Sequence, residues 1–294
     1  MTDDLVTVII PVYNKVEYLF DSLSSVVNQT YSNIEIIVVD DGSNNYDKIL
    51  RIFNNFKKKI KIIKFKRNKG VSAALNAAIL ASNGKYINWL SHDDLFSPTK
   101  IEEQIRSLAG AEDKISITNF ILWNVAKNKK RKIFLEKKDF NDFTENLLLK
   151  DIYNFCTLLV PKKLYVNNYF NEKLRHVQDY DMFLKLSNNV KFFFLDRHLF
   201  ISRVHPHQDS VVKKNRWINE KNNFYINHIQ FYLKILKNKK SFKNIFVFLF
   251  FLRLKKLQRF NLYLDSEISK MNNKKINSVN KIVKIIIKII NNFR

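Results

Sequence analysis

The feature of this sequence that most limits its fold is an alternation of β-branched runs and helix-like segments over the first 110 residues. Strand patterns occur at 6–10, 34–39, 60–65 and 86–90, and helix patterns at 18–27, 72–81 and 97–108. Parallel strands need a crossover segment, usually a helix, between them. The alternation therefore predicts an α/β fold with a mostly parallel central sheet and helices on both faces. Further strands are expected at 115–123, 156–160 and 192–195, and a further helix at 179–186.

Polar residues gather where the first four predicted strands end. These clusters are Tyr13-Asn14, Asp40-Asp41, Arg67-Asn68 and His92-Asp93-Asp94. In open α/β sheets, ligands bind outside the carboxyl ends of the strands. We therefore expect one binding site built from four strand ends.

The rare residue types exclude several classes of protein. The four glycines, at 42, 70, 84 and 110, are too far apart for a G-x-G-x-x-G fingerprint or a phosphate-binding P-loop. The single cysteine, Cys156, allows neither an internal disulfide nor a thiolate metal cluster. The acidic first residues do not resemble a secretory signal, and the apolar run 245–252 is too short to cross a bilayer. We expect a protein located in the cytoplasm.

The charge of the chain predicts an anionic partner. Its 51 Lys and Arg residues against 27 Asp and Glu residues give a net charge of +24. From residue 215 onward the sequence becomes helical in pattern and basic, and 271–294 contains no acidic residue. On a helix, Lys281, Lys284 and Lys288 would share one stripe and the apolar side chains would cover the opposite side, as in an interfacial helix. This pattern predicts peripheral attachment through the C-terminus to the anionic inner face of the cell membrane.

Four ordered segments, 8–14, 35–43, 68–76 and 93–94, carry a resemblance to a known family. Together they resemble family 2 of the inverting glycosyltransferases, of the type that builds bacterial cell-envelope glycans, and the resemblance covers residues 6–210. It implies the GT-A fold, with a catalytic domain at 1–214 and a basic helical region at 215–294. Within the domain we expect a nucleotide-binding half at about 1–110 and an acceptor half at about 111–214.

The resemblance also implies roles for individual residues. Tyr13 and Asp40 or Asp41 would hold the base and ribose of the donor, and Asn68, Gly70 and Asn76 would shape its pocket. The full set of implied donor-binding residues is Pro11, Tyr13, Asn14, Asp40, Asp41, Asn68, Gly70, Asn76, His92, Asp93 and Asp94.

The metal and the catalytic base are implied in the same way. Asp93 would bind Mn²⁺ or Mg²⁺, although Ser91 stands where the family's motif begins with an acid. His205 would complete the metal shell, with His207 as the fallback. Asp179 matches the family's base, which takes the proton of the acceptor hydroxyl, while Gln178 replaces the usual Glu before it.

The predicted activity is transfer of one sugar from a nucleotide-diphospho-sugar, with UDP-hexose or UDP-N-acetylhexosamine preferred, to a lipid-linked or cell-surface glycan. A protein glycosyltransferase of the same fold stays open, because the sequence does not separate the acceptors. A non-catalytic relative is a weaker alternative. Nucleic acid is not expected as a partner, because the basic residues are dispersed rather than arranged in a recognisable reading element.

Overall fold

The computed structural model describes residues 3–56, 59–135, 153–166, 168–187, 190–221 and 223–224. The chain divides into two compact units, residues 1–144 with 152–214 and residues 145–151 with 215–294. Every helix and strand named below belongs to the first unit. The amphipathic helix predicted at 271–294 lies outside the described residues. Within them, no helix is both long and apolar enough to span a bilayer.

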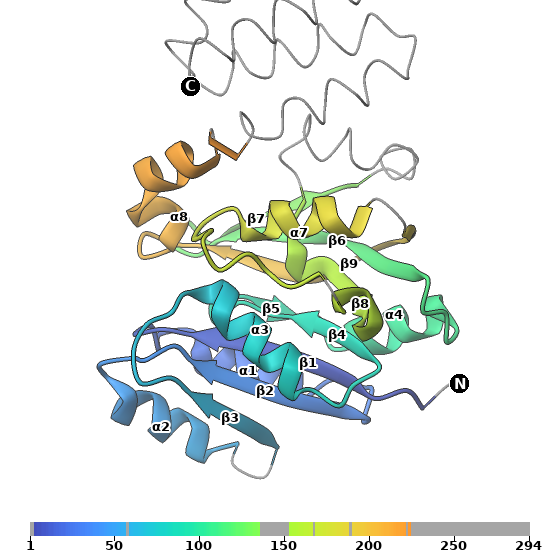
Figure 1. Ribbon diagram of the computed structural model, residues 1–294, viewed down its shortest axis with the longest axis horizontal. Helices are drawn as coiled ribbons and strands as arrows, with labels where there is room; N and C mark the ends of the chain where they lie inside the picture. Colours follow the sequence, from blue (N-terminus) through green and yellow to red (C-terminus); the bar gives the residue numbers. More distant parts are fainter. Residues whose placement is uncertain are drawn as a thin grey trace, which may run out of the picture. The chain divides into compact units, whose positions relative to one another are not determined.

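The first half of the fold is a parallel sheet with intervening helices, as the alternating pattern predicts. The elements are β1 (Val6–Val12), α1 (Leu19–Val27), β2 (Ile34–Asp40), α2 (Tyr46–Asn54), β3 (Ile60–Lys64), α3 (Val71–Ala81) and β4 (Tyr86–Trp89). β1 lies between β2 and β4, β3 pairs with β2, and all three pairings are parallel. Figure 1 shows α3 in front of these strands and α1 behind them.

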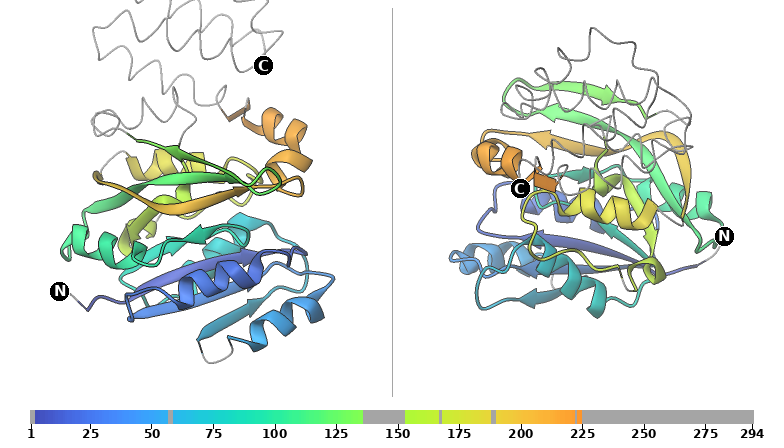
Figure 2. Two further views of the ribbon diagram at one scale, coloured as in Figure 1. Left: turned by 180° about the vertical axis from the view of Figure 1, so that it is seen from behind. Right: turned by 45° about the horizontal axis from the view of Figure 1, so that its top comes forward.

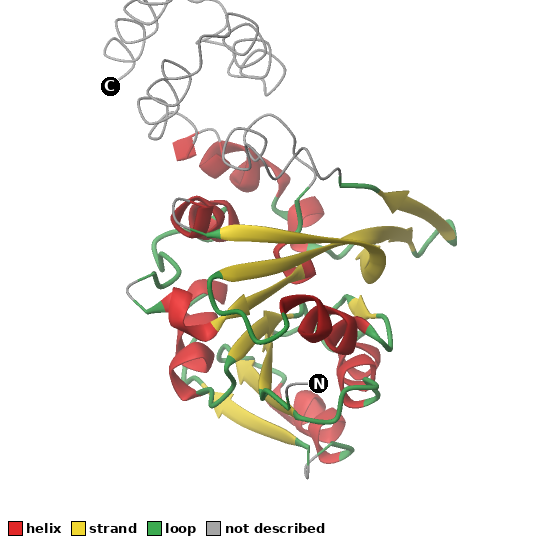
Figure 3. Cartoon of the chain, turned by 90° about the vertical axis from the view of Figure 1, so that its right-hand side faces the viewer, coloured by secondary structure: helices red, strands yellow, loops and turns green. Residues whose placement is uncertain are grey.

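The second half continues the same sheet with mixed strand directions. It contains β5 (Leu95–Phe96), α4 (Lys100–Leu108), β6 (Lys114–Asn124), β7 (Lys129–Ile133), η1 (Phe155–Thr157), β8 (Leu158–Pro161), η2 (Lys162–Tyr165), α7 (Gln178–Ser187), β9 (Lys191–Val204) and α8 (Asp209–Val212). Over the described residues the strand order is β3-β2-β1-β4-β8-β6-β9-β5, and β7 pairs with β6. β8 runs antiparallel to both β4 and β6, so the parallel arrangement stops at β4. Figure 3 shows helices on both sides of the sheet.

The two faces of the parallel strands bury different partners. One face, with Val8 and Ile10 of β1, shares a core cluster with Leu19 and Leu23 of α1 and with Phe53 of α2. The opposite face packs against α3, which contacts β1 and β2. Strands buried on both faces read as continuous apolar runs, which explains why their sequences are β-branched without alternation.

The strand predicted at 192–195 extends much further, because β9 runs from Lys191 to Val204. The polar sequence Asp196-Arg197-His198 directly follows the predicted strand. The structure instead accommodates it in an irregularity, where Thr118 pairs with Leu195 and Asn119 with His198. The Asn119 side chain donates a 2.7 Å hydrogen bond to Asp196 at this point. The longer strand matters because it carries residues 203–205 into the site.

Other elements also differ from the sequence expectation. The helix predicted from residue 97 begins at Lys100, because the Ser97 N–H pairs with the Leu199 carbonyl of β9. α2 and β7 were not predicted. β7 has four consecutive basic residues, all exposed, and therefore lacks the alternation by which a strand is recognised.

Candidate active site

The loops that follow β1 and β2 are joined at the carboxyl edge of the parallel strands. The Asn14 N–H donates to Ser43 Oγ at 2.8 Å, and the Asn44 N–H donates to Asn14 Oδ1 at 2.8 Å. Asn14 adopts a left-handed conformation, with φ of 57°. Pro11 is buried in β1, and Tyr13 just beyond the strand is 37% exposed. The loops after β1 and β2, two of the four predicted strand ends, are therefore joined by hydrogen bonds.

Asp40 and Asp41 are both buried at the end of β2. Asp41 accepts hydrogen bonds from the backbone N–H groups of Lys69 at 2.7 Å and Gly70 at 2.8 Å. Burial raises the pKa of Asp41, and these two donors oppose that shift. Asp40 accepts from the Ser43 N–H at 3.2 Å through Oδ1, while its Oδ2 is buried with no hydrogen-bond partner among the described residues. Asp40 is thus fully buried, with one carboxylate oxygen that no donor among the described residues satisfies.

Two glycines allow the neighbouring loops to approach closely. Gly42 has a φ of 73°, and a Cβ there would lie 2.4 Å from the backbone carbon of Arg67. Gly70, with a φ of 96°, leaves room for the Arg175 guanidinium, which donates to the Lys69 carbonyl at 2.6 Å. Asn68 lies exposed on the same loop. A side chain at 42 would push against the backbone of the loop that holds Asp41, and one at 70 would displace the Arg175 guanidinium.

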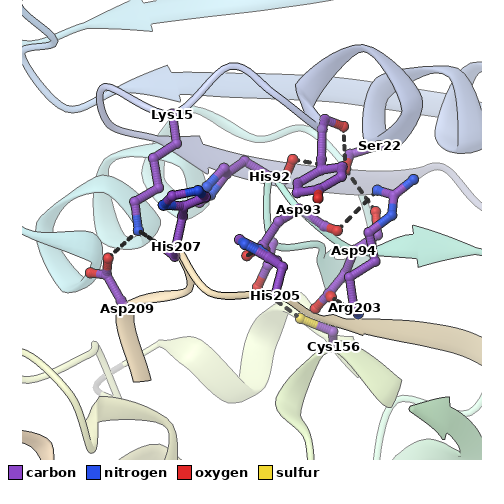
Figure 4. A network of polar contacts seen from close by, with 12 residues as sticks. Lys15, Ser22, His92, Asp93, Asp94, Cys156, Arg203, His205, His207 and Asp209 are labelled. Carbon is purple, nitrogen blue, oxygen red and sulfur yellow. Dashed lines mark hydrogen bonds and ion pairs between the residues drawn. The ribbon is translucent and has the colours of Figure 1, made fainter. Parts of the chain in front are cut away.

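Asp93 and His205 meet where β4 and β9 both end. Asp93 Oδ2 lies 3.0 Å from His205 Nε2, and both residues are buried (Figure 4). The His205 ring packs against Tyr18 of the loop before α1, with ring centroids 4.8 Å apart. The structure therefore brings together the two residues predicted to bind metal, which are 112 positions apart in the sequence. We call them the Asp93–His205 pair.

Arg203 ties this pair to the surrounding backbone (Figure 4). Its Nη1 donates to the Asp93 carbonyl at 3.0 Å and its Nη2 to Asp21 Oδ2 at 2.7 Å. Its backbone N–H donates to Asp94 Oδ1 at 2.7 Å. Arg203 is only 3% exposed, and its guanidinium lies 4.7 Å from the centre of the Tyr18 ring. The end of β9 therefore fixes the turn at 93–94 through several independent contacts.

The two residues on either side of Asp93 have shifted pKa values. Burial and the neighbouring Asp93 carboxylate raise the pKa of Asp94 well above its usual range. Burial lowers the pKa of His92. The Ser22 hydroxyl of α1, which has one proton to donate, lies 2.8 Å from the His92 carbonyl oxygen and 2.7 Å from the Asp94 carbonyl oxygen. The turn is held by its backbone, and the Asp94 carboxylate points to β9 rather than to His205.

The chain after His205 folds back against the loop that follows β1. Lys15 donates at 2.7 Å to the carbonyl of His207 and forms an ion pair with Asp209 of α8. Lys213 pairs with the same carboxylate at 2.8 Å. The His207 side chain is exposed, whereas that of His205 is buried, so the structure places His205 and not the fallback residue beside Asp93.

Asn76 and Asp179 are connected to the site through the segment before α7. The Asn76 amide accepts from the Phe170 N–H at 2.9 Å and donates to the Phe170 carbonyl at 3.0 Å. Ser72 Oγ donates to the Leu174 carbonyl at 3.1 Å. Asp179 follows this anchored segment in the first turn of α7 and is half-buried, with Oδ1 accepting from the Tyr180 N–H at 2.9 Å. Asn76 therefore fixes the backbone at Phe170, in the segment that leads to α7.

Sequence reasoning assigned no role to Arg203 and did not single out Arg175. Arg203 lies beyond the strand predicted at 192–195, so its position beside Asp93 depends on the longer β9. Arg175 had no signal in the sequence, because its contact with the Gly70 loop joins segments more than a hundred residues apart.

Comparison with known proteins agrees with this geometry. Residues 7–164 match the model of the family described as glycosyl transferase family 2. An uncharacterized glycosyltransferase of Rickettsia typhi is 37% identical over 219 residues, which cover 72% of this chain and 68% of that protein.

Two solved structures share the fold at low sequence identity. Staphylococcus aureus TarS 1–349 in complex with UDP-GlcNAc has a TM-score of 0.59 at 15% identity, covering 84% of this chain and 79% of that one. The mannosyltransferase PcManGT of Pyrobaculum calidifontis, in complex with GDP-Man and Mn²⁺, has a TM-score of 0.57 at 16% identity, covering 87% and 71%. The predicted GT-A fold is confirmed. The chain belongs to glycosyl transferase family 2 and is a nucleotide-sugar glycosyltransferase.

Proposed function

We propose that the protein is an inverting, metal-dependent transferase. It moves one hexose or N-acetylhexosamine from a UDP-sugar to an acceptor hydroxyl of a lipid-linked or cell-surface glycan. The observation that carries the proposal is the Asp93–His205 pair, which lies at the same sheet edge as the buried carboxylates of Asp40 and Asp41.

The nucleoside end of the donor lies against the ends of β1 and β2. A carboxylate oxygen accepts hydrogen bonds from base N–H or ribose hydroxyl groups, and Asp40 at the end of β2 carries one, Oδ2, that no described donor satisfies. Asp41 holds the Gly70 loop beside it, through its two backbone hydrogen bonds. The exposed Tyr13 ring at the end of β1 provides an apolar surface for the base.

The residues present fit a divalent cation. A carboxylate oxygen and an imidazole nitrogen are donors that Mn²⁺ accepts, and the two lie 3.0 Å apart in this pair. Among the described residues, no group of three or more His, Cys, Asp and Glu side chains converges on one point. Asp93 and His205 would therefore hold the cation together with diphosphate oxygens of the donor. When bound, the cation would neutralise the charge that develops on the leaving diphosphate.

Asp179 is the proposed base. Its place in the first turn of α7, after a segment bonded to α3 and to the Gly70 loop, gives it a fixed support. Asp179 takes the proton of the acceptor hydroxyl as that oxygen attacks the anomeric carbon. Attack from the side opposite the leaving diphosphate inverts that carbon.

We also propose that the protein works on the cytoplasmic face of the cell membrane, next to a lipid-linked or envelope-glycan acceptor. Support comes from the net charge of +24 and from the basic C-terminal sequence.

The donor site is tested by thermal unfolding with UDP, GDP, dTDP and CMP, each with and without Mn²⁺. A nucleotide at about 100 times its Kd adds about 2.7 kcal/mol to the stability of the native state. We expect UDP to raise the Tm only when Mn²⁺ is present, and Asp93→Asn to abolish that increase. Asp47→Asn, which changes an exposed carboxylate on α2, is the matched control.

The same protein preparations test the base. Asp179→Asn should keep the Mn²⁺-dependent UDP stabilisation and lose transfer of sugar from UDP-sugar to a glycan acceptor, by about 10²-fold or more. Asp181→Asn, two residues further along α7, should retain transfer. No stabilisation of the wild-type chain by any nucleotide would contradict the donor site. Normal transfer by Asp179→Asn would contradict only the base.

A further inference from the structure

We propose that the hairpin formed by the end of β6, the following turn and β7 is a docking surface for an anionic phospholipid bilayer. We call residues 120–134 the basic hairpin. It is separate from the basic C-terminal sequence and lies within the part of the chain that the structure describes.

The basic hairpin concentrates charge of one sign. Its cationic side chains, all of them exposed, are Lys127, Lys129, Lys130, Arg131 and Lys132. No acidic residue occurs anywhere between residues 114 and 135. None of the five cations forms an ion pair with a described carboxylate, whereas Lys85, Arg106 and Arg197 elsewhere on the surface do. Unpaired cations near an anionic lipid surface each contribute about 1 kcal/mol of attraction.

The cations lie on both faces of the strand. Successive side chains in a strand point to opposite faces, so Lys130 and Lys132 share one face while Lys129 and Arg131 share the other. β7 pairs with β6 alone among the described strands, and Figure 2 (left) shows it as the outermost of the green strands. A ligand lying on one face would need cations on that face only. Cations on both faces suit a strand edge set against a broad anionic surface.

An aromatic side chain accompanies the charges. Phe134, which directly follows β7, is 60% exposed, and its ring packs edge-on against His198 with centroids 4.7 Å apart. Exposed aromatic rings beside basic residues are typical of proteins that insert slightly into the lipid headgroup region.

The basic hairpin is also close to the candidate active site. Trp123 of β6 is paired with Lys130 on one side and with Arg203 on the other. The Lys130 Nζ lies 4.8 Å, and the Arg203 guanidinium 5.6 Å, from the Trp123 ring centre. Arg203 in turn donates to the Asp93 carbonyl. A bilayer bound at the hairpin would therefore lie near the position where a lipid-linked acceptor must meet the donor.

Basic residues on an edge strand have another known use, which is to prevent edge-to-edge aggregation. That use predicts self-association when the charges are removed and no change in lipid binding. The two explanations can therefore be separated by one set of variants.

The experiment is cosedimentation of the full chain with phosphatidylcholine vesicles that contain or lack phosphatidylserine. Two double variants are compared, Lys129→Gln with Arg131→Gln and Lys130→Gln with Lys132→Gln. Each should lower partitioning onto the vesicles roughly 25-fold, since about 1 kcal/mol per residue corresponds to about fivefold. The exposed pair Lys48→Gln with Arg51→Gln on α2 is the matched control and should change partitioning by less than about twofold. Lys127→Gln lies in the turn outside the strand pairing and should lower partitioning about fivefold. This variant tests the proposal even if a variant within the strand fails to fold.

The outcomes separate the possibilities. Loss of vesicle binding by both double variants of β7, with an unchanged Tm increase from UDP and Mn²⁺, supports the docking surface. An effect of the Lys130 and Lys132 pair alone would instead indicate a phosphate subsite on the face that leads to the active site. Unchanged vesicle binding accompanied by aggregation of the variants, or tight binding of the wild type to RNA but not to vesicles, would overturn the proposal. None of these results depends on sugar transfer, so failure here leaves the proposed activity standing.

Discussion

At the scale of single residues, Arg203 organises the centre of the site without being a proposed ligand. It contacts the Asp93 carbonyl, the Asp94 carboxylate and Asp21 through three different nitrogen atoms. A planar guanidinium can make two side-chain hydrogen bonds in fixed directions, which an ammonium group cannot reproduce. Arg203 is therefore a positioning residue for the Asp93–His205 pair.

Arg203→Lys should keep the charge but lose one of the two side-chain hydrogen bonds. We expect a loss of about 1–3 kcal/mol in Mn²⁺-dependent UDP binding, measured as a weaker Tm increase and a higher KM for the donor. The control is Arg197→Lys. Arg197 lies on β9 like Arg203 and forms an ion pair with Glu103 of α4. A variant that loses stability but keeps the wild-type Mn²⁺ dependence would show that Arg203 has only a structural role.

At the scale of elements, α4 carries a buried cation into the core. Lys100 is fully buried, and its Nζ donates to Gln104 Oε1 at 2.6 Å and lies 4.3 Å from the centre of the Phe96 ring. Burial lowers the pKa of Lys100 to about 7. Between that value and the ordinary lysine pKa of about 10.4, the unfolded chain binds a proton that the folded chain does not. Stability should therefore rise with pH across this range.

Lys100→Met should remove this pH dependence and stabilise the fold at pH 7 by roughly 2–4 kcal/mol, because it replaces a buried ammonium with an apolar side chain of similar length. Denaturant unfolding at pH 7, 7.5 and 8 should show the wild-type chain gaining about 1 kcal/mol of stability over this pH unit and a flatter profile for the variant. Lys59→Met, at an exposed position, should keep the wild-type slope. A Lys100→Met profile as steep as that of the wild type would refute the assignment.

At the scale of the whole molecule, the net charge of +24 is divided between the catalytic part and the C-terminal sequence. Residues 271–294 contain six basic and no acidic residues, so their removal leaves a net charge of +18. The proposed basic hairpin belongs to the first unit and the C-terminal sequence to the second, and we expect each basic segment to contribute to binding of an anionic bilayer.

Deletion of 271–294 should reduce partitioning onto phosphatidylserine vesicles while leaving the Tm increase from UDP and Mn²⁺ unchanged. Combining the deletion with the Lys129 and Arg131 variant should abolish the remaining partitioning. Increasing the NaCl concentration should release the wild-type chain, because salt screens surface charges. Full vesicle binding by the deleted chain would refute attachment through the C-terminus.

The parallel strands of the first half of the fold, and the polar residues that follow them, could be predicted from the sequence. Continuous β-branched runs at 6–10 and 34–39 are strands buried on both faces, and their pattern does not depend on distant partners. Because parallel strands end at the same edge, the sequence also predicted that residues 13–14, 40–41 and 93–94 would gather there. The roles of Asp179 and of the donor-binding residues stay predictions.

The contribution of the second half to the site depends on contacts between segments that are distant in the sequence. The irregularity at Asp196 keeps β9 running to Val204, and this extension places Arg203 and His205 against the turn at 93–94. The contact between Arg175 and the Gly70 loop is equally non-local. β7 was missed because an edge strand exposed on both faces needs no apolar alternation. Local pattern determines which segments form strands, whereas pairing between distant strands determines which side chains meet.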